Sequence, residues 1–383
     1  MHNVYINIVA HYNRIIVKIG SNVLTRHDGT LDVTRMSALV DQVADLHKQG
    51  IEVVMVSSGA VASGRGEMRG DKAVKRHLDV VSARQLFSAV GQAKLINRYY
   101  ELFREHGIVC GQVLTTKEDF ATRHQYLNQK HCMEVMLDNG VIPIVNENDT
   151  TSVTELMFTD NDELSGLIAA MMGAQALVLL SNVDGVYDGD PGDPASSIIR
   201  EISPEEKNAA DPDTFISKSK SSLGRGGMGS KFNTARKVAS EGIAVYIANG
   251  RRDDILPGII GDNAIPGNVP YTLFIPSARP VSGMKKWIAH SDSFAKGEIH
   301  VNQGAYEALT SPRRATSLLP VGVTRVEGEF EKDDIVKIIS PAGETFAMGR
   351  ICCDSATAVA RAGTQGSRPL IHYDYLYIEK ENG

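Results

Sequence analysis

Short, nearly continuous apolar runs recur along the first two thirds of the chain, and each has the length of a buried β-strand. The runs are rich in Val, Ile and Leu and lie at residues 14–19, 51–56, 108–114, 141–145, 176–180 and 243–248. Helical patterns separate them, such as the apolar stripe over 36–46, which Gly50 ends. Apolar strands that alternate with helices predict an α/β fold with a mainly parallel, open sheet sandwiched by helices.

The stretch from 141 to 187 indicates where such a sheet would bind a ligand. Its first strand, 141–145, runs into the polar cluster Asn-Glu-Asn-Asp at 146–149. A second cluster, Asp-Asn-Asp at 160–162, stands where a helix over 164–171 should begin. Turns and N-caps also use Asp and Asn, and would explain either cluster alone. Because ligands bind at the carboxyl ends of strands in open α/β sheets, the two clusters together favour a site for an amine or for a metal carried by phosphates.

Two other strand ends carry a similar signal. Lys18 lies inside the first apolar strand and is followed by Gly20 and Ser21. A lysine is unusual there because charges are seldom buried without a partner. It either snorkels from an edge strand or reaches a ligand at the strand end, where Gly20 permits close approach of the backbone. The second strand likewise ends in small residues, Ser-Ser-Gly-Ala at 57–60.

A glycine-rich loop at residues 217–231 forms a further candidate site. It ends at Lys231, where the pattern predicts the start of a helix. Free amide groups at a helix N-terminus, a pliable loop and a lysine are typical of an anion site. The loop differs from a Walker P-loop, since Ser230 precedes Lys231 where that motif has Lys followed by Ser or Thr. A flexible linker would have a similar composition.

The pattern changes after residue 276. Residues 277–295 have the composition of a hinge, and short strands separated by turns follow at 298–301, 322–326, 335–339, 345–350 and 375–378. We therefore expect an α/β domain over 1–276, a linker over 277–295 and a small β-rich domain over 296–383.

Composition and charge narrow the class of protein. The net charge of −6 argues against nucleic acid or an anionic membrane as a partner. The four cysteines lack the spacing of a disulfide framework or zinc site, which favours a reducing compartment. No apolar run approaches the ~20 residues of a membrane span, and the first ten residues lack the features of a signal peptide. We expect a soluble, cytoplasmic protein.

Taken together and in this order, the motifs resemble the amino acid kinase superfamily, and most closely its glutamate 5-kinase family. The motifs that carry the likeness are Lys18-x-Gly20-Ser21, the clusters at 57–60, 146–149 and 160–162, and Gly226-Gly227-Met228 followed by Lys231. The C-terminal segments GEIHVNQGA, SLLPVGV and VEGEF resemble a PUA domain. The likeness extends over nearly the whole chain, from Arg14 to Ile378.

The resemblance implies ATP-dependent phosphorylation of the side-chain carboxylate of L-glutamate, with Mg²⁺, to give γ-glutamyl 5-phosphate in the first step of proline biosynthesis. It implies catalytic roles for Lys18, Lys231 and Asp162, and substrate binding by Ser58, Asp149 and Asn161. The nucleotide-binding residues that it implies are Lys18, Gly20, Ser21, Ser181, Asn182, Arg225, Gly226, Gly227, Met228, Gly229, Ser230 and Lys231. It assigns no residue as a direct metal ligand.

The resemblance also implies a homo-oligomer, a dimer or tetramer, and hand-over of the labile product to glutamyl phosphate reductase. It leaves open whether proline is a feedback inhibitor and what the PUA domain does. One departure concerns the substrate side: many family members carry a lysine three residues before Asp160, where this chain has Met157. A milder one is Ser181-Asn182, where some relatives have Thr-Asp.

Two alternatives remain. The chain could belong to another carboxylate kinase of the same superfamily, acting on aspartate or N-acetylglutamate. It could instead bind RNA through the PUA-like region. Residues 297–383 hold 12 acidic and 9 basic side chains, and this balance argues against strong binding to a phosphate backbone.

Overall fold

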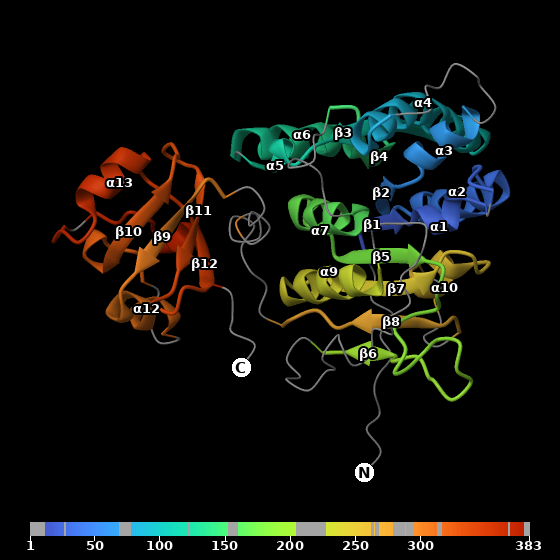
Figure 1. Cartoon of the computed structure of the whole chain (residues 1–383). Helices are drawn as coiled ribbons and strands as arrows, with labels where there is room; N and C mark the ends of the chain where they lie inside the picture. Colours follow the sequence, from blue (N-terminus) through green and yellow to red (C-terminus); the bar gives the residue numbers. More distant parts are fainter. Residues whose placement is uncertain are drawn as a thin grey trace, which may run out of the picture. The chain divides into compact units, whose positions relative to one another are not determined.

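The computed structural model describes residues 12–26, 28–68, 78–121, 123–151, 160–203, 227–261, 264, 268–278, 288, 295–311, 316–366 and 368–378. The chain divides into two compact units (Figure 1). The first comprises Met1–Thr116 and His131–Pro280, and the second comprises Lys117–Lys130 and Val281–Gly383.

An eight-stranded sheet forms the centre of the first unit, in the order β3-β4-β2-β1-β5-β7-β8-β6. Its strands are β1 (Arg14–Ile19), β2 (Glu52–Ser57), β3 (Val109–Thr115), β4 (Val141–Glu147), β5 (Ala176–Ser181), β6 (Glu201–Ile202), β7 (Ala244–Asn249) and β8 (Tyr271–Phe274). The pairings among these strands are parallel, apart from β7 with β8. The prediction of a mainly parallel sheet is confirmed. The short strands β6 and β8 were not predicted.

The helices of the first unit connect these strands. They are α1 (Ser21–Leu24), α2 (Val33–Lys48), α3 (Ala60–Glu67), α4 (Val80–Glu105), α7 (Asn161–Met172), α9 (Met228–Ser240) and α10 (Ile255–Ile259). Helix α5 (Glu118–Ala121) belongs to the second unit, and α6 (Arg123–Asp138) is divided between the two units after Lys130. Helix α2 ends as predicted, because Gly50 follows it at a φ of 84°, in the left-handed region that glycine tolerates.

The two faces of the sheet are covered by different helices. Ile15, Val17 and Ile19 of β1 pack with Met36 of α2 in one apolar core. Successive side chains of a strand point to opposite faces. Lys18 therefore points to the other face, where α7 packs against β1 and β5, and α9 against β7. This register places Lys18 on the face covered by α7, whose start carries the cluster at 160–162, and by α9, whose first turn carries Lys231.

Helices α3 and α4 cross at very close range because glycine stands at the crossing on both. A Cβ atom added at Gly64 would lie 1.8 Å from the carbonyl oxygen of Phe87, and one added at Gly91 would lie 1.8 Å from that of Ala60. No other residue fits at that separation. The crossing fixes α4 against the segment that follows β2, and so positions the polar side chains of α4 described below.

The second unit has a sheet and core of its own. Its strands, in the order β10-β9-β11-β12-β13, are β9 (Gly297–Val301), β10 (Val323–Gly328), β11 (Ile335–Ile339), β12 (Thr345–Arg350) and β13 (Leu376–Ile378). Helices α12 (Gln303–Thr310) and α13 (Ser355–Arg361) accompany them. Ile299, Ile338 and Leu370 lie in an apolar cluster separate from that of the first unit. The predicted β-rich C-terminal region is confirmed.

Candidate active site

Two buried lysines meet on one carboxylate at the carboxyl edge of the sheet. Asp162, which is 0% exposed, lies 2.5 Å through Oδ1 from Lys18 Nζ and 2.9 Å through Oδ2 from Lys231 Nζ. Burial by itself would raise the pKa of Asp162, but the charges of Lys18 and Lys231 outweigh burial and hold that pKa below its ordinary value. The structure thus brings together Lys18, Asp162 and Lys231, which are more than two hundred residues apart at their extremes.

The helix N-termini of α7 and α9 hold this cluster in place. Asp160 caps α7 by accepting hydrogen bonds from the backbone N–H groups of Asp162 at 2.9 Å and Glu163 at 3.0 Å. The Ser230 hydroxyl, in the first turn of α9, donates to Asp160. Helix α9 begins at Met228 and not at Lys231, so the predicted start was three residues late. As a result Lys231 extends from within the first turn, next to Ser230.

Asn161 joins the second and fourth strands. Its Nδ2 donates to the backbone oxygen of Ser57 at 2.9 Å, to Oγ of Ser58 at 2.9 Å and to Oδ1 of Asn146 at 3.1 Å. The predicted residues Ser58 and Asn161 are therefore in direct contact. Strand β4 continues through Glu147, so Asn146 and Glu147 belong to the strand end and not to the following loop.

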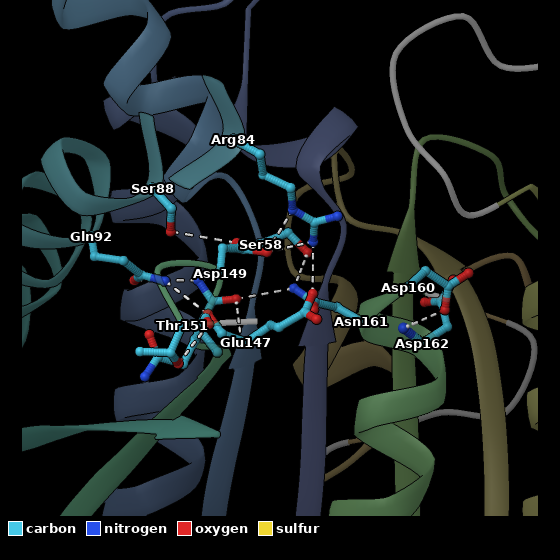
Figure 2. A network of polar contacts seen from close by, with 12 residues as sticks. Ser58, Arg84, Ser88, Gln92, Glu147, Asp149, Thr151, Asp160, Asn161 and Asp162 are labelled. Atoms are coloured by element: carbon cyan, nitrogen blue, oxygen red, sulfur yellow. Dashed lines mark hydrogen bonds and ion pairs between the residues drawn. The ribbon is translucent and has the colours of Figure 1, made fainter. Parts of the chain in front are cut away.

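Asp149, the third predicted substrate residue, is held by a residue that the sequence analysis missed. Arg84 Nε donates to Asp149 Oδ1 at 2.6 Å, and Arg84 Nη2 donates to Glu147 Oε2 at 2.7 Å. Figure 2 shows Arg84, Ser88 and Gln92 reaching from α4 toward Glu147 and Asp149. Gln92 Nε2 donates to the backbone oxygen of Glu147 at 3.2 Å. In the sequence these three residues form only a polar stripe at i, i+4 and i+8 within α4, which does not distinguish them from a face exposed to water.

The predicted nucleotide residues that the structure describes lie at the ends of β1 and β5 and at the start of α9. The backbone N–H of Gly20 donates to the oxygen of Leu180 at 3.1 Å, which places the end of β1 next to Ser181 and Asn182 at the end of β5. Gly227 forms the N-cap of α9 without a side-chain hydrogen bond, and Met228 and Gly229 follow in its first turn. Ser21 begins α1. Arg225 and Gly226, like Met157, lie outside the described residues.

The carboxylates of this site already have partners in the described structure. Asp162 pairs with two lysines, Asp160 caps a helix, and Arg84 pairs with Glu147 and Asp149. Within the part of the chain that the structure describes, the one cluster of metal-ligating side chains is Glu298, His300 and Glu327, in the second unit. Among the described helices, none is both long and apolar enough to cross a membrane.

Comparison with known proteins shows which protein family has this fold. Residues 13–249 match the amino acid kinase family model, and residues 297–369 match that of the PUA domain. The solved structure of carbamate kinase from Giardia lamblia bound to AMP-PNP is 17% identical, with a TM-score of 0.50, and the match covers 69% of this chain and 99% of that one. At this identity the likeness concerns the fold. The fold and site define an amino acid kinase with a C-terminal PUA domain.

Two curated relatives narrow the class. Glutamate 5-kinase from Bacteroides thetaiotaomicron is 63% identical over 368 residues, which cover 96% of this chain and 99% of the relative. Glutamate 5-kinase from Chlorobaculum tepidum is 46% identical over 368 residues, which cover 96% and 98%. The chain belongs to the glutamate 5-kinase family.

Proposed function

We propose that the protein transfers the γ-phosphoryl group of ATP to the side-chain carboxylate of L-glutamate. A carboxylate oxygen forms a bond to the γ-phosphorus, the bond from that phosphorus to the β,γ-bridging oxygen breaks, and ADP and γ-glutamyl 5-phosphate result. The observation that carries this proposal is the pair of buried lysines on Asp162. The relative at 63% identity supports glutamate as the acceptor.

The lysine pair suits the electrostatics of this reaction. The transferring phosphoryl group carries charge on its three equatorial oxygens, and the attacking carboxylate is itself an anion. Lys18 and Lys231 approach Asp162 from a strand and from a helix, so they can place positive charge on two sides of the phosphoryl group. Asp162 would position both ammonium groups, and its lowered pKa keeps it ionised while it does so.

The amino acid would bind on the neighbouring side of α7. Asp149 supplies a carboxylate for the α-ammonium group, and Ser58 and Asn161 supply polar groups that already contact one another. Because Asn161 and Asp162 are consecutive at the start of α7, the acceptor side and the phosphoryl side are joined by one rigid helix end. This arrangement would hold acceptor and donor in a reactive orientation.

ATP would bind along the ends of β1 and β5 and the start of α9. The residues that we propose for it are Lys18, Gly20, Ser21, Ser181, Asn182 and Arg225 to Lys231. The amide groups at the N-terminus of α9 suit phosphate oxygens. Mg²⁺ fits this site as an ion carried by the phosphates, because the nearby carboxylates are engaged with cations or a helix cap. It would neutralise phosphate charge.

We also propose a pathway, an oligomeric assembly and a domain division for the protein. The protein would act in the cytoplasm, in the first step of proline biosynthesis, as a dimer or tetramer that passes its product to glutamyl phosphate reductase. The kinase domain would span 1–276, the linker 277–295 and the PUA domain 296–383, with matches at 13–249 and 297–369 in support.

Substrate assays test the proposal. With Mg²⁺ and ATP, the purified protein should release ADP with L-glutamate, and hydroxylamine should trap the acyl phosphate. L-Aspartate and N-acetylglutamate serve as the competing acceptors. Equal kcat/KM for aspartate and glutamate would contradict the assignment of the acceptor while leaving a carboxylate kinase. Absence of ADP release with all three would contradict the proposed class of reaction.

A further inference from the structure

Arg84 lies between two buried carboxylates on the amino acid side of the site. Its Nε and Nη2 atoms donate to Asp149 at 2.6 Å and to Glu147 at 2.7 Å. Asp149 is 5% exposed and Glu147 is 2% exposed. Water and salt screen such buried pairs weakly, so a ligand that enters here must match the charges that it meets.

We propose that Arg84 and Asp149 together bind the charged groups on the α-carbon of the substrate, with Arg84 pairing with the α-carboxylate and Asp149 with the α-ammonium. This inference rests on the proposed function and extends it by naming Arg84 as a residue that determines which amino acid substrate is bound. An amino acid zwitterion carries the same two charges as the Arg84–Asp149 pair. Its insertion exchanges the Arg84–Asp149 pair for two pairs with the ligand, while Arg84 keeps its pair with Glu147, so that none of the three protein charges is left without a partner.

The surroundings of Arg84 fit this role. Ser88 and Gln92 follow it at i+4 and i+8 within α4, and Gln92 fixes the end of β4 through the backbone oxygen of Glu147 at 3.2 Å (Figure 2). Arg84 is therefore held on a helix and not on a loop. Its planar guanidinium can form two parallel hydrogen bonds to a carboxylate, which an ammonium group cannot do.

The pairing makes a prediction about ligands that lack one of the two charges. 4-Aminobutyrate is glutamate without its α-carboxylate, and glutarate is glutamate without its ammonium group. Both retain the carboxylate that receives the phosphoryl group. Each would leave one buried protein charge unmatched, so the wild-type protein should use them with kcat/KM lower by roughly 10²-fold or more.

The experiment measures ADP release with L-glutamate, 4-aminobutyrate and glutarate for the wild type and three variants. Arg84→Gln should lower kcat/KM for glutamate, mainly through KM, while that for 4-aminobutyrate changes little. The ratio of the two should fall by roughly tenfold or more. For Arg84→Lys this ratio should lie between those of the wild type and Arg84→Gln, since lysine keeps the charge but lacks the planar guanidinium that forms two parallel hydrogen bonds. Arg98→Gln is the matched control on α4, because Arg98 pairs with Glu101 at 2.7 Å and is 40% exposed.

Several results would overturn the role of Arg84. These are wild-type use of 4-aminobutyrate as efficient as that of glutamate, and an unchanged ratio in a folded Arg84→Gln. If Arg84→Gln does not fold, an unchanged ratio in Arg84→Lys has the same meaning. A wild-type protein inactive with glutamate contradicts the proposed function instead. Calorimetric binding of the three ligands, which requires no turnover, then decides the role of Arg84: equal affinities for glutamate and 4-aminobutyrate overturn it, and stronger binding of glutamate supports it.

Discussion

Replacement of Asp162 by Asn removes the carboxylate that both buried lysines contact. Lys18 is 4% exposed and Lys231 is 7% exposed, and their ammonium groups lie 2.5 Å and 2.9 Å from Asp162. Removal of one partner of a buried ion pair costs about 3–5 kcal/mol. For a domain of this size, 1 kcal/mol lowers Tm by about 2–4 °C. We therefore expect the Tm of Asp162→Asn to lie about 6–20 °C below that of the wild type at pH 7.

The pH dependence of this difference gives a second test. The folded pKa of Asp162 lies below its ordinary value of 3.8, so its ion pairs stabilise the fold above that value. The stabilisation is lost as the pH falls through the lower folded pKa. The Asn side chain does not titrate, so the difference in Tm should be widest near neutral pH and should narrow below about pH 4. Thermal unfolding followed by circular dichroism measures both trends.

Glu52→Gln is the control for this experiment. Glu52 pairs with Arg14 at 2.5 Å at the amino end of the same sheet, but its side chain is 38% exposed. Exposed ion pairs contribute about 0–1 kcal/mol, so Tm should fall by less than about 4 °C. A folded Asp162→Asn with a Tm within about 2 °C of the wild type at pH 7 would refute the reasoning that Asp162 neutralises both lysines.

Three further predictions concern other parts of the first unit. Asp149→Asn should raise KM for glutamate by roughly 10- to 100-fold, because charge-assisted hydrogen bonds contribute about 1.5–3 kcal/mol. A larger rise in KM for ATP than for glutamate would contradict the assignment of Asp149 to the amino acid. Gly91→Ala should lower the free energy of unfolding in urea by about 1–3 kcal/mol, because its Cβ would lie 1.8 Å from the oxygen of Ala60. Gly366→Ala is its control, because nothing lies within 4 Å of a Cβ atom added there. Equal urea midpoints for Gly91→Ala and the wild type would contradict the close crossing of α3 and α4. A chain ending at Pro276 should stay folded and release ADP with glutamate; insolubility would show that the C-terminal region stabilises the first core.

The sequence alone predicted the sheet and singled out Lys18 for a physical reason, whereas the joint role of Lys18, Lys231 and Asp162 was implied by the family resemblance. An apolar run long enough for a strand identifies β1, and a charge within that run, Lys18, needs a partner. Asp160, two residues before Asp162, stands directly before an apolar helix, so its role as an N-cap can also be predicted from the neighbouring sequence. The strands β6 and β8 escaped prediction because two and four residues are too short to show a period.

Arg84 could not be identified from its neighbours in the sequence. A polar stripe on a helix of 26 residues is typical of a face exposed to water. Only the close crossing of α3 and α4, and the extension of β4 through Glu147, bring that stripe to the carboxylates. The start of α9 was predicted late because Gly227 caps it without a side-chain hydrogen bond, and so leaves no polar N-cap signal.

The most direct test of the lysine pair is the kcat of Lys18→Ala and Lys231→Ala with ATP and L-glutamate. Loss of one preorganised electrostatic donor lowers kcat by roughly 10²–10³-fold, and we expect that fall in each variant, with smaller changes in both KM values. Lys48→Ala, in which an exposed lysine of α2 is removed, is the control and should retain wild-type kcat. A folded Lys18→Ala or Lys231→Ala with near wild-type kcat would contradict the proposal that these lysines stabilise the transferring phosphoryl group.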